Sequence, residues 1–78
     1  MVQAYVFINV QAGTAKDVVR KLRRKKFVKT VHLVTGLHDA IAFIEGKNLK
    51  VLADNITDGI HKVKGITKTV TCVVVNGK

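Results

Sequence analysis

The sequence predicts an α+β fold, a ferredoxin-like βαββαβ sandwich with one antiparallel four-stranded sheet. Four segments rich in β-branched and aromatic residues are typical of strands, and two segments with apolar residues every three or four positions are typical of helices. Their order divides the chain into two similar halves. With right-handed crossovers the strand order becomes 4-1-3-2, and both helices cover the same face. At 78 residues, we expect one domain over residues 1–78.

The first half begins with a strand over residues 2–10, whose side chains alternate between the two faces of the sheet. A helix is predicted over residues 14–25. Thr14 is its expected N-cap, and Asp17 follows in the first turn, where a carboxylate suits the positive helix end. The residues of this helix that we expect to face the core are Ala15, Val18, Val19 and Leu22.

A strand over residues 28–35 ends the first half and a strand over residues 38–45 begins the second, and the two form a hairpin closed by a tight turn at Gly36. The last strand is predicted over residues 66–75.

The second helix is predicted over residues 48–63, because six apolar residues recur there at helical spacing. Gly59 lies at the edge of this stripe and costs helix stability, so we attribute it to a close approach between the helix and the sheet. The six apolar residues are Leu49, Leu52, Ala53, Ile56, Ile60 and Val63.

Both faces of the sheet are predicted to be apolar. Tyr5 and Phe7 point away from the helices in the first strand, and Ile41 and Phe43 alternate with small apolar residues in the third. An antiparallel sheet that faces water is normally polar on that side. We therefore expect a second subunit on the open face, which makes this a fold of the dimeric α/β sandwich or barrel type.

The composition restricts the class of protein. Hydrophobic residues make up 47% of the chain and the mean hydropathy is +0.20, which is too apolar for a disordered chain. The single cysteine, Cys72, fits a reducing compartment. No secretory leader is visible, and no segment has the roughly 20 apolar residues of a membrane helix. We expect a cytoplasmic protein without membrane association.

The segment from Val34 to Asp39 has the most specific pattern. Gly36 can adopt a positive φ and leaves backbone N–H groups accessible, while Asp39 places a carboxylate nearby. Together they can hold both charged ends of a small zwitterion. The alternative is structural: Gly36 permits the turn, Asp39 braces the hairpin, and the Thr35 hydroxyl braces the turn.

This segment resembles the effector domain of the Lrp/AsnC (feast/famine) regulators, also called the RAM domain, whose signature here is Val34-Thr35-Gly36-x-x-Asp39. The similarity extends to residues 4–8 and to residues 65–71, and so covers nearly the whole chain. It implies an effector-binding and oligomerisation module of transcription regulators, in the variety that lacks a helix-turn-helix and has no specific DNA binding of its own.

The resemblance also implies partners and a site. It implies a homodimer through the open sheet face, assembly of dimers into a ring such as an octamer or decamer, and co-assembly with full-length Lrp/AsnC regulators. An amino acid or similar small metabolite would bind between dimers. The effector-binding residues would be Thr35, Gly36, Leu37, His38 and Asp39, of which Leu37 and His38 occupy variable motif positions.

A basic cluster supports a different function, a nucleic-acid-binding accessory protein. The net charge is +9, and seven of the 14 basic residues lie between Arg20 and Lys29. Such a cluster can bind phosphates. The residues that would bind are Arg20, Arg23, Arg24 and Lys26. We favour the simpler interpretation, a solvated helix face, because these basic side chains occupy the side of an amphipathic helix opposite its apolar stripe.

We expect no metal, no cofactor and no catalytic residues. His32, His38, His61 and Cys72 are too scattered to converge, and a zinc site needs three or four ligands. A small enzyme of the dimeric α/β-barrel type is a third hypothesis. It is disfavoured because the chain has only five acidic residues, no serine and no glycine-rich phosphate loop.

Overall fold

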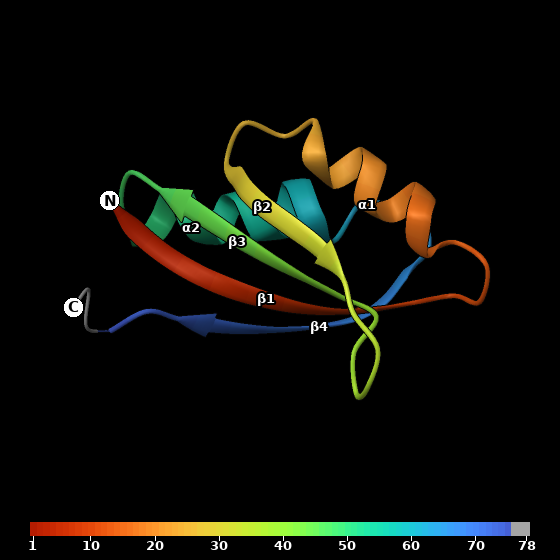
Figure 1. Ribbon diagram of the computed structural model, residues 1–78. Helices are drawn as coiled ribbons and strands as arrows, with labels where there is room; N and C mark the ends of the chain where they lie inside the picture. The colour runs from red at the N-terminus through yellow and green to blue at the C-terminus, as the bar shows by residue number, and fades with distance from the viewer. Residues whose placement is uncertain (76–78) are drawn as a thin grey trace.

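The computed structural model describes residues 1–75, which form a four-stranded sheet and two helical segments (Figure 1). The second helical segment changes from α-helix to π-helix part-way along. In chain order the elements are β1 (Val2–Val10), α1 (Ala15–Arg23), β2 (Val28–Leu33), β3 (Ala40–Gly46), α2 (Leu49–Asp54), the π-helix η1 (Asn55–Ile60) and β4 (Ile66–Val73).

The sheet has the order β2-β3-β1-β4 with every neighbouring pair antiparallel, which confirms the predicted 4-1-3-2 topology. β1 lies at the centre, where Tyr5 is opposite Phe43 on one side and Cys72 on the other. Both helical segments lie on the same face of the sheet, and no described element covers the other face (Figure 1). The chain therefore has the ferredoxin-like α+β fold.

The hydrophobic core lies between the sheet and the helices. Ala4, Val6 and Ile8 alternate along β1 and have no exposed surface. The predicted buried face of α1 is confirmed for three residues, and Ala15 is partly buried. The core residues outside β1 are Val18, Val19, Leu22, Val28, Val31, Ala40, Ala42, Ile44, Leu52, Ile60 and Val63.

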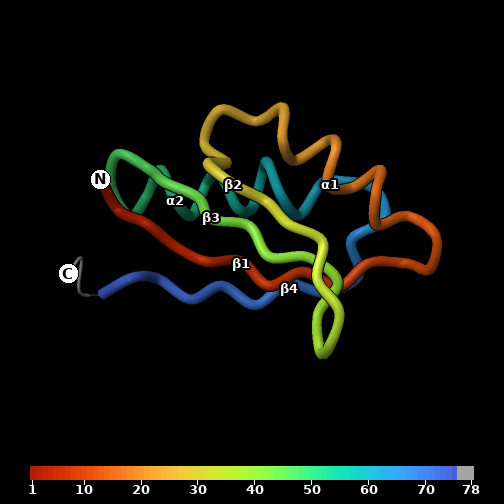
Figure 2. Tube along the Cα trace, viewed as in Figure 1, coloured from red at the N-terminus to blue at the C-terminus, as the bar shows by residue number. Residues whose placement is uncertain are grey.

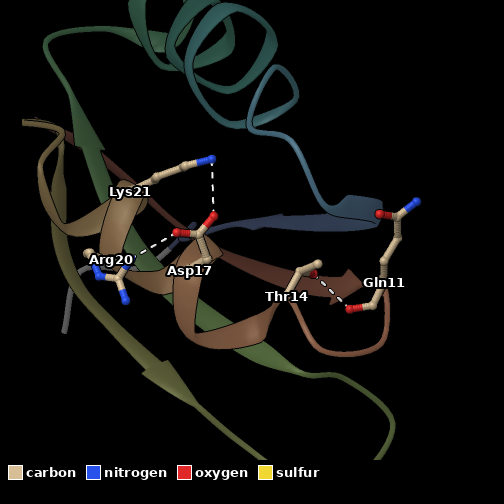
Figure 3. Close-up of polar contacts among 5 residues, drawn as sticks. All are labelled: Gln11, Thr14, Asp17, Arg20 and Lys21. Carbon is tan, nitrogen blue, oxygen red and sulfur yellow. Dashed lines mark hydrogen bonds and ion pairs between the residues drawn. The ribbon is translucent and has the colours of Figure 1, made fainter.

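The start of α1 differs from the prediction. Thr14 occupies the N-cap position, but its backbone is already helical (φ −106°, ψ −3°) and its hydroxyl does not cap the helix. The hydroxyl donates instead to the Gln11 carbonyl at 2.7 Å (Figure 3). A side-chain cap requires an extended backbone at this position, which explains the difference. α1 is also shorter than predicted and ends at Arg23.

The connection between β2 and β3 is not the tight turn that we predicted. β2 ends at Leu33 and β3 begins at Ala40, so residues 34–39 form a six-residue loop. The reason is a long-range contact: the Asp39 N–H donates to the Ile8 carbonyl of β1 at 2.9 Å, which draws the end of the loop toward β1.

The second helical segment begins as predicted and then changes period. The Asn48 side chain caps α2 by accepting from the Val51 N–H at 2.9 Å. In η1 the His61 N–H donates to the Ile56 carbonyl at 2.9 Å, an i to i+5 bond that an α-helix lacks. The predicted stripe is therefore broken. Leu52, Ile60 and Val63 are buried and Ile56 is partly buried, whereas Leu49 and Ala53 are exposed.

Gly59 does allow a close approach, but the neighbour is not the sheet. A Cβ at this position would lie 2.6 Å from Cζ of the Phe27 ring, in the connection between α1 and β2. β4 also differs slightly from the prediction, because it ends at Val73 rather than at residue 75.

Candidate functional site

The loop of residues 34–39 projects from the end of the sheet on the side away from the helices (Figures 1 and 2). The Val34 N–H closes it by donating to the Asp39 carbonyl at 3.0 Å. Gly36 has φ +132°, and a Cβ there would meet nothing within 4 Å. The glycine is therefore required by its backbone conformation and not by crowding.

Two hydrogen bonds fix Asp39 to the end of β1. Its backbone N–H donates to the Ile8 carbonyl at 2.9 Å, and its carboxylate Oδ2 accepts from the Val10 N–H at 2.8 Å. Oδ1 has no hydrogen-bond partner within residues 1–75. The carboxylate thus braces the loop as the structural alternative predicted, and it keeps one oxygen for a further contact.

Asn9 of β1 makes the second connection to the loop. Its Nδ2 donates to the Leu37 carbonyl at 3.0 Å, and its Oδ1 lies 3.1 Å from His38 Nδ1. The His38 ring also packs against Phe7, with ring centroids 5.2 Å apart. The role of Asn9 was not predicted from the sequence, although a polar residue within an apolar strand was its signal.

The predicted effector-binding residues therefore lie together on one loop but have different surroundings. Thr35, Gly36 and Leu37 are exposed, with Leu37 at 90%, whereas His38 and Asp39 are partly buried against β1. In one chain the loop projects from the end of the sheet (Figure 2), and its residues line neither of the two grooves found beside β2. Any ligand held on it would need a further wall.

The open face of the sheet carries an aromatic and aliphatic surface next to this loop. Tyr5 and Phe43 pack with ring centroids 4.9 Å apart, and Tyr5 is still 45% exposed. Phe7 and Ile41 continue the surface, and Val70 of β4 is 40% exposed. Aromatic side chains of this size are normally covered in a folded protein.

The basic residues proposed for nucleic-acid binding are not all in one place. Arg20, Arg23 and Arg24 line a groove between α1 and β2, and Lys26 is not among its lining residues. Arg23 Nη2 donates to the Val31 carbonyl at 3.3 Å. Arg20 is paired with Asp17 at 2.9 Å (Figure 3).

The histidines do not form a metal site within residues 1–75, where no three His, Cys, Asp or Glu side chains lie close enough to hold an ion. His32 lines the groove beside α1, His38 lies on the loop, and His61 is 2.9 Å from the Thr69 hydroxyl. In the described part of the chain no helix is both long and apolar enough to cross a membrane.

The fold and the loop define a class of protein, a ferredoxin-like domain with an uncovered apolar sheet face and a hydrogen-bonded loop beside it. Residues 3–77 match the family model of the Lrp/AsnC ligand binding domain. The chain belongs to the Lrp/AsnC ligand-binding domain family, as the Val34 to Asp39 motif indicated.

The curated relatives are transcription regulators. An uncharacterised HTH-type regulator from Pyrococcus furiosus is 27% identical over 75 residues, which are 96% of this chain and 51% of the relative. LrpA from Pyrococcus abyssi is 34% identical over 58 residues, which are 74% of this chain and 41% of LrpA. The chain thus spans about half the length of the curated relatives it matches.

Solved structures of similar length share the fold throughout. FFRP-DM1 superposes with a TM-score of 0.93 at 33% identity, covering 96% of this chain and 100% of that chain. The hypothetical protein PHS023 from Pyrococcus horikoshii superposes with a TM-score of 0.92 at 33% identity, covering 97% of this chain and 92% of that chain. TTHA0845 from Thermus thermophilus superposes with a TM-score of 0.94 at 26% identity, covering 100% of this chain and 98% of that chain.

Proposed function

We propose that this domain binds an amino acid or similar small metabolite on the 34–39 loop and couples binding to oligomerisation. The observation that carries the proposal is the fixed geometry of the loop, which is tied to β1 by Asp39 and Asn9. A surface already held in place loses little conformational entropy when a ligand binds. The family membership supports a binding role in the cytoplasm rather than catalysis, because the curated relatives are transcription regulators.

The chemistry of the loop suits a zwitterion. The backbone around Gly36 is exposed and can donate to a carboxylate, while Asp39 Oδ1 can accept from an ammonium group. Thr35, Leu37 and His38 would then distinguish one side chain from another. The missing wall would come from a neighbouring subunit.

The open sheet face supplies the reason for association. In one chain Tyr5 and Val70 are exposed and Phe43 is only partly buried. Burying such an apolar surface against a second subunit is favourable by about 25 cal/mol per Å². We propose a homodimer through this face, and rings of dimers, octameric or decameric, joined near the 34–39 loop. Full-length Lrp/AsnC regulators with the same surface could join such assemblies.

Calorimetry with the common amino acids, run in parallel with sedimentation, tests the proposal. Methionine belongs in the panel because a Neisseria meningitidis regulator of the same fold, 15% identical, was crystallised as a complex with L-Met. We expect heat of binding for at least one amino acid and a change in assembly at the same concentration. The absence of both for every amino acid would overturn amino-acid sensing.

The variant Asp39→Asn distinguishes two roles of Asp39, a direct contact with the ligand and structural support of the loop. The amide can still accept from the Val10 N–H, so the loop is expected to keep its conformation. The charge opposite the effector ammonium is lost, and we expect affinity to fall by at least about tenfold, or about 1.4 kcal/mol. Unchanged affinity in calorimetry would show that Asp39 only supports the loop.

A nucleic-acid accessory role is the second candidate, favoured by three arginines on one side of α1. Filter binding across a salt series tests it. Tight complexes at physiological salt that are lost in the triple variant Arg23→Ala, Arg24→Ala, Lys26→Ala would place this function ahead of metabolite binding.

A further inference from the structure

A groove of about 660 Å³ lies between α1 and β2, and no residue of the 34–39 loop lines it. Its volume is within the range of small-molecule binding sites, about 300–1,000 Å³. One wall is a face of α1, and the other is the end of the outer strand β2. The proposed effector function makes no use of this groove.

The α1 wall is a row of cations. Lys16, Arg20, Arg23 and Arg24 are spaced i, i+4, i+7 and i+8, which places them on one side of the helix. No acidic residue lines the groove. Planar guanidinium groups bind phosphate oxygens in pairs, so this row is suited to a ligand with several phosphates.

Part of the positive charge in and around the groove is neutralised. Asp17 is paired with the groove residue Arg20 at 2.9 Å and with Lys21, outside the groove, at 3.2 Å (Figure 3). Beyond the groove Lys29 is paired with Glu45 at 3.6 Å. Lys16 and Arg24 form no ion pair with the residues that the structure describes. A groove bounded by the nine-residue α1 and the end of β2 suits a compact polyanion better than a long phosphate backbone, which needs a continuous basic track.

The floor and the second wall are partly apolar. Val19 is almost fully buried at the bottom, while Leu33 is 46% exposed at the end of β2 beside His32. An exposed leucine and an imidazole next to a row of cations can pack against the organic part of a charged ligand.

We propose that this groove binds a nucleoside polyphosphate, with its phosphates on the basic row of α1 and its nucleoside against Leu33 and His32. No residue of the 34–39 loop lines the groove, so nucleotide binding here and amino-acid binding on the loop are tested by separate titrations.

Calorimetric titration with ATP and with inorganic triphosphate at physiological ionic strength tests the proposal. ATP is expected to bind more tightly than triphosphate because only ATP contacts Leu33. The double variant Lys16→Gln, Arg24→Gln should weaken ATP binding by at least about tenfold, since it removes two charged donors. The matched control Lys47→Gln, Lys62→Gln removes the same charge outside the groove and should weaken binding by less than about twofold.

Leu33→Ala supplies a second readout. It should bring the affinity for ATP close to that for triphosphate and leave triphosphate binding unchanged. Absence of ATP binding, equal weakening in both double variants, or equal affinity of the unaltered protein for ATP and triphosphate would each overturn the proposal. A single-stranded oligonucleotide that displaces ATP, with affinity that increases with strand length, would assign the groove to nucleic acid instead.

Discussion

Asp39 and Asn9 connect the 34–39 loop to the sheet through side chains that lie about thirty residues apart in sequence. Asp39 satisfies the Val10 N–H at the end of β1, and Asn9 satisfies the Leu37 carbonyl. Both backbone groups would otherwise need water. The loop conformation therefore depends on two polar side chains, and only one of them belongs to the recognised motif.

Glu45 gives the residue-scale prediction about pH. The Gln3 amide donates to its carboxylate at 2.9 Å and lowers the pKa of Glu45, and the Lys29 ammonium at 3.6 Å lowers it further. The folded chain thus favours the ionised form. This stabilisation is fully present above the unfolded pKa of about 4.3 and is lost as the pH falls through the lower folded pKa.

We therefore expect the melting temperature of Glu45→Gln to fall less steeply than that of the unaltered protein between about pH 5 and pH 3. Thermal denaturation followed by circular dichroism measures this. Asp58→Asn is the control, because its carboxylate lies 3.9 Å from Lys62 on the exposed side of η1. Parallel pH profiles for Glu45→Gln and the unaltered protein would contradict the prediction.

At the scale of the elements, the strands and their order were predictable because alternation and β-branched residues are local signals. The ends were not. β2 ends two residues early and β3 begins two residues late, and the loop between them is held by the bond from Asp39 to Ile8, a contact that no local window contains. The change to η1 at Asn55 has no signal at helical spacing either, and the prediction that Leu49 and Ala53 face the core was wrong.

The two candidate sites also differ in how far the sequence alone predicts them. The five predicted effector-binding residues are contiguous, and the Thr35-Gly36-x-x-Asp39 motif predicted them directly. The groove beside α1 combines Arg24 with Leu33 from the neighbouring strand. Its existence depends on how α1 lies over β2, which the basic cluster alone did not indicate.

Gly59→Ala tests the packing of η1. Alanine favours a helix by about 1 kcal/mol over glycine, but its Cβ would lie 2.6 Å from Phe27 Cζ, and overpacking costs about 1–3 kcal/mol. We expect a net loss of about 1 kcal/mol in the free energy of unfolding, measured by urea denaturation. In a Phe27→Leu background the same change should be neutral or stabilising. An equal loss in both backgrounds would contradict a clash with the ring.

At the scale of the whole molecule, the helices shield one face of the sheet (Figure 1), and the other face carries the aromatic residues Tyr5 and Phe43. A chain of this length has a small core, and a second subunit adds buried area that one chain cannot provide. Because the 34–39 loop lies on the same side, a ligand bound there as proposed would be coupled to the state of assembly.

Phe43→Lys tests the proposed dimer. A lysine at the centre of the open face would be desolvated in the dimer but solvated in one chain. We expect the dimer dissociation constant to rise by at least about a hundredfold, measured by sedimentation equilibrium, with an unchanged far-ultraviolet circular dichroism spectrum. Leu49→Lys, an equivalent change at a 61% exposed residue of α2, is expected to leave assembly intact. Dimers of unchanged affinity in Phe43→Lys would exclude this face as the interface.

The guanidinium of Arg23 donates a hydrogen bond to the Val31 carbonyl on the outer strand β2. A border strand whose carbonyl is already engaged by a bulky cation is a poor template for an incoming strand, and arginine or lysine there repels another copy of itself. Arg23, one of the residues proposed to bind phosphate, thus also disfavours the addition of further strands at this edge of the sheet. The dimer proposed through the open face is, by contrast, a closed assembly with a limited number of subunits.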